Sequence, residues 1–327
     1  MNRAGITRRL LPLLLAPLAG VRPALAQDFP SRPIRLIVPW PPGGVTDLAA
    51  RVVAQQLAER LSATVVVDNR AGAAGVIGAQ AAARAAPDGY TLLLASAETH
   101  AIAPNLRDNL PYDPLKDFSA VAPFAINPFS LVARGDFPAA NTRDLVAAVA
   151  AAPGKFTYSS AGLGSASQIA METFKGLAKL DILHVPFPGQ APALASLTGG
   201  QTDLQMLPAG SAASLREGGR IKVFAVTTAN RFFGMPDIPS LREEGFAPMD
   251  FANTFGLVAP AGTPAEAVQR LSAAMAAVVT SAEAEAALRR IGLEVFAPMS
   301  PADFQRFLEA ELPRWGQVIR AANIRPD

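Results

Sequence analysis

IRLIVPWPPGGVTDLAARVVAQQLAERL, residues 34–61, is the stretch of this chain that decides its fold. Residues 34–38 are a short apolar run that ends at a proline, which predicts a buried strand. Residues 45–61 place Leu48, Val52 and Leu57 on one face of a predicted helix. A loop of prolines and glycines joins the two, so the stretch predicts one strand-turn-helix unit of an α/β fold.

The same alternation recurs along the chain in two series. The first continues with a predicted strand at 65–67, a helix at 75–86 and a strand at 91–94. After a proline-rich stretch at 111–128, strands at 156–159, 182–186, 203–207 and 221–227 alternate with helices at 142–152, 167–178 and 191–197. A strand at 255–259 and helices at 264–279, 282–291 and 301–322 follow, and the residues alone leave open whether they return to the first series. The pattern predicts two lobes with mainly parallel sheets flanked by helices.

The first 26 residues are typical of a signal peptide and not of a folded segment. Three arginines precede an apolar run at 10–18, and an A-x-A cleavage pattern follows at 24–26. The run is interrupted by prolines and is far shorter than the roughly 20 residues that span a bilayer. We expect cleavage near Ala26, a mature chain that begins at Gln27, and export to the periplasm. Residues 7–11 also resemble a twin-arginine signal, so the export route stays open.

Composition excludes several classes of protein. The chain has no cysteine, and therefore no disulfide, no thiolate metal site and no cysteine for a lipid anchor. Outside the predicted leader it has 25 basic and 27 acidic residues, a net charge of −2, so its apparent basicity comes from the leader. No basic stripe with interleaved aromatic residues is left, which argues against nucleic acid as a partner. An anionic ligand would need a locally built site.

The loop at 38–47 is the first candidate for such a site, and its candidate residues are Trp40, Pro41, Pro42, Gly43 and Gly44. In open α/β folds, ligands lie beyond the carboxyl ends of strands, where helix N-termini offer unpaired N–H groups to anions. Thr46 or Asp47 lies near the predicted helix start. For Asp47 we favour a structural role in capping the helix over contact with a ligand.

A similar turn occurs in the second series, at residues 158–167. Its candidate site residues are Ala161, Gly162, Leu163, Gly164, Ser165, Ala166 and Ser167. The hydroxyls of Ser165 and Ser167 would add to the backbone donors and hold a carboxylate without an arginine. The alternative is that these serines only cap the helix. The occurrence of one such turn in each series favours a cleft between two lobes.

A third turn, at residues 184–192, adds Phe187, Pro188 and Gly189 to the candidate cleft wall. Asp203 either caps a strand or faces the cleft, and we include it in the candidate site. His184 lies inside an apolar strand, which favours a packed side chain. His100 has only Glu98 near it, so we expect no metal site, and we expect no cofactor.

The sequence gives little support to an enzyme. It contains no G-x-S-x-G, phosphate-loop or H-E-x-x-H motif, and the glycines at 162 and 164 lack the third glycine of a dinucleotide fingerprint. A periplasmic serine esterase that uses Ser159 or Ser160 with His184 is the remaining enzymatic alternative. We expect a binding protein and no catalytic residues.

The order of these segments resembles one family throughout the mature chain, the periplasmic receptors of tripartite tricarboxylate transporters, also called Bug proteins. The resemblance rests on FPSRPI at 29–34, VPWPPGG at 38–44, NRAGA at 69–73, APDGYTL at 86–92, LPYDPLKDF at 110–118, VAPAGTP at 258–264 and WGQVI at 315–319. It implies a two-lobed Venus-flytrap fold of the type II kind, with both chain ends in the first lobe. Lobe 1 is then 27–123 and 228–327, and lobe 2 is 124–227.

The resemblance also implies a function. Family members hold a small carboxylate between the lobes through main-chain amides, hydroxyls and waters, and in some cases the bound ligand is delivered to membrane permease subunits. A sensor receptor that presents its ligand to a histidine kinase is the alternative. Matched by position, the ligand-facing segments are 40–44, 161–167, 187–189 and Asp203. We expect a monomer whose hinge lies near 124–132 and 221–227.

Departures from the family pattern fall near the expected ligand. Members often have Tyr-Lys-Gly where this chain has Phe187-Pro188-Gly189, His at the position of Gln168, and Phe-Asp where residues 207–209 are Leu-Pro-Ala. Each change removes a polar or charged group. We therefore expect a ligand with one well-held carboxylate and an apolar or aromatic remainder packed by Trp40, Leu163 and Phe187. Its identity stays open.

Overall fold

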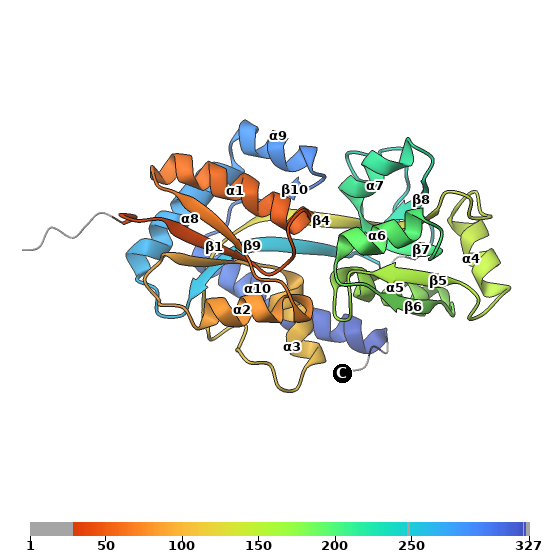
Figure 1. The fold of residues 1–327 in the computed structure, drawn as a ribbon, viewed down its shortest axis with the longest axis horizontal. Helices are drawn as coiled ribbons and strands as arrows, with labels where there is room; N and C mark the ends of the chain where they lie inside the picture. The colour runs from red at the N-terminus through yellow and green to blue at the C-terminus, as the bar shows by residue number, and fades with distance from the viewer. Residues whose placement is uncertain (1–28, 247–248, 323, 325–327) are drawn as a thin grey trace, which may run out of the picture.

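The chain folds into two lobes that share one mixed sheet. A computed structural model describes residues 29–246, 249–322 and 324, so the predicted leader at 1–26 and Gln27 lie outside the described residues. Figure 1 shows the two lobes side by side, with the long strands β4 and β9 running across the boundary from one lobe towards the other. The α/β, two-lobed fold class is confirmed.

The sheet of the first lobe is built around β1 (Ile34–Val38), which pairs in parallel with β2 (Val65–Asn69) and β3 (Thr91–Ala95). Helices α1 (Val45–Leu61) and α2 (Val76–Ala83) connect these strands. The predicted strand-turn-helix unit at 34–61 therefore has the bounds expected from the sequence. The buried face of α1 differs from the predicted one, because Leu48 is 40% exposed while Ala49, Val53 and Leu57 are buried.

The sheet of the second lobe repeats this scheme. Strand β5 (Thr157–Ser160) pairs in parallel with β6 (Leu183–Pro186) and β7 (Leu204–Pro208). Helices α5 (Ala166–Ala178) and α6 (Gln190–Thr198) follow β5 and β6. Since both lobes place helix N-termini after the carboxyl ends of parallel strands, the turns of the two lobes point to the boundary between them.

Strand β4 (Phe118–Arg134) joins the lobes, and the sequence analysis missed its extent. Its first half pairs with β9 (Ala252–Pro260), and its second half pairs with β7 and β8 (Ile221–Val226), all antiparallel. The sequence analysis gave the proline-rich stretch at 111–128 no element and expected a crossing between the lobes only near 124–132. The register of the β4–β9 ladder shifts between Pro123 and Ala125, an irregularity of the kind that admits proline in a strand. The sheet is therefore mixed and not mainly parallel.

The remaining elements lie around this frame. They are η1 (Ala73–Gly75), η2 (Glu98–Ile102), α3 (Ala103–Leu106), α4 (Thr142–Ala150), α7 (Ala209–Arg216), α8 (Ala265–Val279), α9 (Ala282–Arg290), β10 (Glu294–Val295) and α10 (Pro301–Ala321). The sequence analysis did not predict η2, α3, α7 or β10. Within the described residues no single helix is long and apolar enough to cross a membrane, although the bent pair α8 and α9 meets the length and composition test together.

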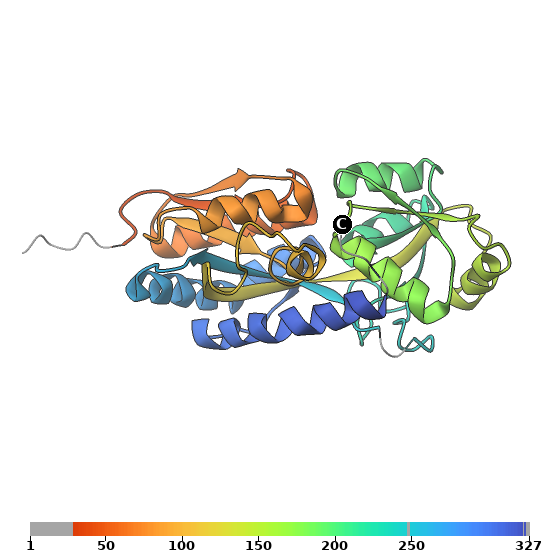
Figure 2. The same ribbon diagram turned by 90° about the horizontal axis from the view of Figure 1, so that it is seen from below.

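The C-terminal helices do return to the first lobe. Leu271 and Met275 of α8 share a buried cluster with Ile34 and Leu36 of β1. Helix α10 continues past the boundary, and its Trp315 packs in the core of the second lobe. Figure 2 shows α10 running along the first lobe, with its C-terminal end reaching the second lobe. The lobe boundaries at 123/124 and 227/228 stay a prediction.

The two chain crossings between the lobes are tied together by Thr227, which is fully buried. Its hydroxyl accepts a hydrogen bond from the Phe129 N–H at 3.1 Å and lies 2.6 Å from the Phe251 carbonyl oxygen, to which it donates. Residue 129 belongs to β4, and residue 251 immediately precedes β9. This junction lies in the segments where a hinge is expected, near 124–132 and 221–227, and the hinge itself stays a prediction.

Candidate functional site

A cavity of about 100 Å³ lies between the two lobes. It is lined by Trp40, Pro41, Pro42, Gly44, Val45, Thr46, Glu98, Asn127, Phe129, Ala161, Ser165, Ala166, Ser167, Pro188, Gly189, Gln190, Ala191, Pro192, Pro208 and Asn253. Each of the three turns singled out in the sequence contributes to this wall. Of the predicted residues, ten line the cavity: Trp40, Pro41, Pro42, Gly44, Ala161, Ser165, Ala166, Ser167, Pro188 and Gly189.

The N-termini of four helices converge on this cavity. The lining residues include the N-caps of α1, α5, α6 and α7, which are Gly44, Ser165, Gly189 and Pro208. No side chain caps the first turn of α1, α6 or α7, so their N–H groups have neither an intrahelical nor a capping partner. Such N-termini carry partial positive charge and bind anions. The cavity therefore attracts an anion through its backbone.

The lining residues include no lysine, arginine or histidine, and Glu98 is the one ionisable side chain among them. An anion bound here would be held by N–H groups and hydroxyls, as the near-neutral charge of the chain led us to expect. No cluster of three or more His, Asp or Glu side chains in the described part of the chain is placed to hold a metal ion.

Asp47 stabilises the first turn, at residues 38–47, through its hydrogen bonds. Its carboxylate accepts hydrogen bonds from the Gly43 N–H at 3.0 Å, from Asn69 at 2.9 Å and from Arg51 at 3.0 Å. Burial works to raise the pKa of Asp47, but these hydrogen bonds, led by that of Arg51, outweigh burial and hold the pKa below its usual value. Asp47 does not line the cavity, so the structural role that we favoured fits the geometry.

The serine turn is also held by internal bonds. Ser165 caps α5 by accepting from the Gln168 N–H at 3.3 Å, and it donates to the Gly162 carbonyl at 2.7 Å. Ser167 Oγ accepts from the Ala161 N–H at 3.1 Å. Both serines are buried in the cavity wall, so capping and ligand contact are compatible at this turn.

The turns of the two lobes approach each other beside the cavity, and their Gly164 and Gly189 have φ angles of 74° and 126°, which residues with a side chain rarely adopt. A β-carbon at Gly189 would lie 3.7 Å from Pro41 Cγ, and one at Gly164 would lie 3.6 Å from Ala74 Cβ. Gly43, Gly162, Leu163, Gly164 and Phe187 flank the cavity without lining it. Leu163 is exposed, because its turn directs it to the surface. Of the three side chains expected to pack an apolar ligand, Trp40 alone is in the wall, and Phe129 joins it there.

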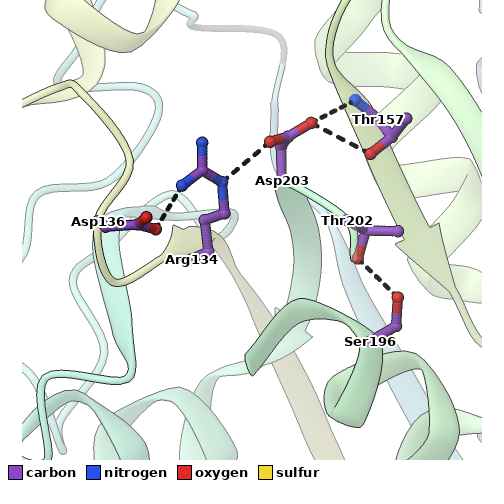
Figure 3. A network of polar contacts seen from close by, with 6 residues as sticks. All are labelled: Arg134, Asp136, Thr157, Ser196, Thr202 and Asp203. Carbon is purple, nitrogen blue, oxygen red and sulfur yellow. Dashed lines mark hydrogen bonds and ion pairs between the residues drawn. The ribbon is translucent and has the colours of Figure 1, made fainter. Parts of the chain in front are cut away.

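Asp203 lies elsewhere, and we remove it from the candidate site. It precedes β7 and accepts hydrogen bonds from Arg134 Nε at 3.0 Å and from Thr157 N–H at 2.9 Å (Figure 3). The cavity lies at the opposite end of β7, where Pro208 lines it. Pro208 is about 16 Å from Asp203 along the strand, at 3.3 Å per residue. The carboxylate thus anchors the amino end of β7 to β4 and β5.

Replacing Asp203 by alanine is expected to lower the free energy of unfolding by about 1–3 kcal/mol, because the partly buried Thr157 N–H and the Arg134 guanidinium lose their acceptor. Ligand affinity should stay within about twofold of wild type. Chemical denaturation and calorimetric titration of the same preparations measure the two effects. A tenfold loss of affinity in a stably folded Asp203→Ala protein would return Asp203 to the site.

Glu98, Asn127 and Asn253 are cavity residues that the sequence analysis missed. Glu98 begins η2, and the two asparagines lie opposite each other on β4 and β9. Nothing local marks them, since they come from three segments that are brought together only by the fold. His100, two residues further on, is fully buried, and burial lowers its pKa to about 3, so the imidazole is neutral.

The structure contains one contact that the serine esterase hypothesis requires. Ser160 Oγ lies 2.6 Å from His184 Nε2. The other imidazole nitrogen faces the Gln168 side-chain amide at 3.5 Å and not a carboxylate, and neither Ser160 nor His184 lines the cavity. Ser160 is also fully buried. The pair lacks the third group and the substrate access of a catalytic triad, and it supports the serine turn instead.

Comparison with known proteins gives consistent matches. A family model described as tripartite tricarboxylate transporter family receptor matches residues 49–324. Protein BugT of Bordetella pertussis is 33% identical over 94% of both chains. The structure of Rpa4515 of R. palustris with adipate has a TM-score of 0.88 and 35% identity, and covers 92% of this chain and 100% of its own. MatC of Rhodopseudomonas palustris with bound malate has a TM-score of 0.83 and 32% identity, with 89% and 100% covered.

Proposed function

Because the chain belongs to the tripartite tricarboxylate transporter receptor family, we propose that it binds a small carboxylate between its lobes in the periplasm and delivers it to the permease subunits of such a transporter. The observation that carries this proposal is the convergence of four helix N-termini on a cavity without a basic side chain. A carboxylate satisfies unpaired N–H groups and the partial positive charge of helix N-termini at once.

The uncapped N-termini of α1 and α6 are the main carboxylate donors in this proposal. They face each other from the two lobes, as the approach of Gly189 to Pro41 shows. The buried Ser165 and Ser167 hydroxyls extend the polar wall on the second lobe. One bound carboxylate would then join the lobes through N–H groups of both. The adipate and malate of the two similar structures support this class of ligand.

The cavity sets the size of the ligand. About 100 Å³ holds roughly seven to ten water-sized groups at 10–15 Å³ each. This fits a small organic acid and excludes a peptide. The rings of Trp40 and Phe129 supply the apolar part of the wall against which a hydrocarbon segment would pack.

Transport follows from hinge motion in this proposal. Opening about the junction of β4, Thr227 and residue 251 would separate the N-termini of α1 and α6 and expose them to solvent. The ligand would rejoin them and stabilise the closed form, which a permease then recognises. A monomer suffices for this cycle, since both faces of the cavity belong to one chain.

Ligand release tests the proposal. Protein purified without added ligand is denatured, the released small molecules are identified by mass spectrometry, and each acid found is returned to the native protein in a thermal unfolding assay. A specific ligand at 100 times its dissociation constant should add about 2.7 kcal/mol of stability. If neither the recovered compounds nor a broad panel of organic acids shifts the unfolding temperature, carboxylate binding is excluded.

A further inference from the structure

The serine turn (residues 161–167) lies at the meeting point of the cavity and the two lobes. A β-carbon at its Gly164 would lie 3.6 Å from both Ala74 Cβ and Leu106 Cδ1 of the first lobe. Four residues of the turn also line the cavity, namely Ala161, Ser165, Ala166 and Ser167. The position of this turn therefore affects both the wall that a ligand meets and the fit of the lobes around it.

Gln168, in the first turn of α5, holds Gly164 through its side chain. The Gln168 Oε1 accepts a hydrogen bond from the Gly164 N–H at 2.6 Å, and the Gln168 backbone N–H donates to Ser165 Oγ at 3.3 Å. Gln168 is buried, with 8% of the residue exposed. Because the Gly164 N–H needs an acceptor, the contact fixes which end of the Gln168 amide faces the turn. The NH₂ end of the amide therefore faces the other way.

The NH₂ end of Gln168 faces His184 on β6, and its Nε2 lies 3.5 Å from His184 Nδ1. A donor on that side requires Nδ1 to be an acceptor, so the imidazole is neutral and carries its proton on Nε2. This Nε2–H donates to Ser160 Oγ at 2.6 Å. Ser160 Oγ also accepts from the Gly162 N–H at 3.2 Å and donates to the Gly162 carbonyl oxygen at 3.3 Å. Each donor in this series of contacts has an acceptor while His184 is neutral.

The surroundings of His184 favour this neutral form. Burial has the largest effect and lowers the pKa of His184. Glu172 and Lys175 face the imidazole from α5, where the carboxylate raises its pKa and the ammonium group lowers it. These two groups are paired at 2.9 Å. Tyr158, whose ring stacks on the imidazole from β5, donates to the same Glu172 oxygen as Lys175. That Glu172 oxygen is therefore already bound by two donors.

A proton on His184 Nδ1 would set a second donor against the Gln168 NH₂ group. Rotating the amide to present Oε1 to His184 would take that oxygen away from the Gly164 N–H. We propose that Gln168 is a positioning residue that holds the serine turn in its ligand-binding form, and that it does so only while His184 is neutral. This inference rests on the proposed function and adds control of the same site by acid. Since the ligand-binding form has one proton fewer than the released form, affinity falls as pH falls through the range where His184 is protonated.

Two variants separate this mechanism from a purely structural role. His184→Gln keeps an amide donor for Ser160 and has no proton to gain, so the His184 contribution to the pH dependence should vanish. Gln168→Glu supplies a carboxylate that accepts from the Gly164 N–H and from protonated His184 at once, so acid should no longer release the turn. Adipate and malate are the probes, titrated by calorimetry at several pH values. Comparison with His184→Gln at each pH removes the protonation of the probes themselves. Between pH 7 and pH 5, we expect wild-type affinity to fall about 10-fold more than that of either variant.

Nuclear magnetic resonance without ligand tests the turn itself. The chain has two histidines, and burial lowers the pKa of His100 to about 3, so an imidazole signal that moves between pH 7 and pH 5 belongs to His184. We expect the Gly164 amide signal of the wild-type protein to shift with the same midpoint as the His184 ring. In His184→Gln, the Gly164 signal should stay in place over that range.

A Gly164 signal that does not move while His184 titrates would overturn the inference and leave carboxylate binding untouched. Equal pH dependence of affinity in wild type and His184→Gln would overturn it as well. If neither acid binds at any pH, the proposed function loses its support, and the Gly164 and His184 titrations decide the positioning role alone. Thermal unfolding verifies that each variant is folded, and should one not fold, the wild-type titrations decide.

Discussion

Gly210→Leu is expected to weaken ligand binding about 100-fold while both lobes stay folded. Gly210 lies in the first turn of α7, and a β-carbon there would be 2.3 Å from Gly292 Cα, beyond α9 on the first lobe. No side chain fits that contact unless the backbones separate. Overpacking of this kind typically costs 1–3 kcal/mol for small insertions, and a leucine adds several carbons. Opening the lobes relieves the strain, so the substitution destabilises the closed form relative to the open form. Ligand affinity falls because the ligand binds the closed form.

The matched control is Gly218→Ala, in the same region but with no atom closer than 3.7 Å to the added β-carbon, and its affinity should equal that of wild type. Calorimetric titration with the recovered ligand measures affinity, and small-angle X-ray scattering measures the radius of gyration. We expect the radius of gyration of the Gly210→Leu protein to be larger than that of wild type in the presence of ligand. Unchanged affinity and size would mean that the contact plays no part in closure.

Proline at the first position of α1 or α6 should weaken carboxylate binding roughly 10- to 100-fold per substitution. Val45 and Gln190 occupy these positions, after the N-caps Gly44 and Gly189. Proline is tolerated at the first position of a helix, where the N–H has no intrahelical partner, so Val45→Pro and Gln190→Pro each delete one donor and keep the helix. A charge-assisted hydrogen bond contributes about 1.5–3 kcal/mol, which gives the expected loss.

Alanine at the same positions is the control, because Val45→Ala and Gln190→Ala shorten the side chain and keep the backbone N–H. The affinity ratio between each proline variant and its alanine counterpart isolates the N–H group. Equal affinities within both pairs would show that the carboxylate is bound somewhere other than these two helix N-termini. Circular dichroism and thermal unfolding verify that the helices are intact.

The three turns could be predicted because their chemistry is local. Prolines and glycines end β1, β5 and β6 and precede helices, and the carboxyl ends of parallel strands meet at one edge of a sheet. The same rule bears on Asp203. It is the first residue of the predicted strand at 203–207 and so lies at the amino end, opposite the ligand edge, which the geometry of the Arg134 and Thr157 contacts confirms.

The cavity residues Glu98, Asn127 and Asn253 could not be predicted, because they are distant from one another in sequence. Glu98 is bonded to Asn253 across 155 residues and to Ala166 across 68. The register of β4 against β9 brings Asn127 beside Asn253, and the proline-rich first part of β4 was not predicted as a strand. Helices such as α7, rich in alanine, serine and glycine, carry too weak an apolar period to mark their own bounds.

The most direct measurement compares the recovered acid with its methyl ester in calorimetric titrations of the wild-type chain. Esterification removes the negative charge and leaves the rest of the ligand nearly unchanged. If helix N-termini of both lobes hold the carboxylate, the ester should bind at least about 100-fold more weakly than the acid. An ester that binds as tightly as the acid would contradict the account, because the cavity would then recognise something other than a carboxylate.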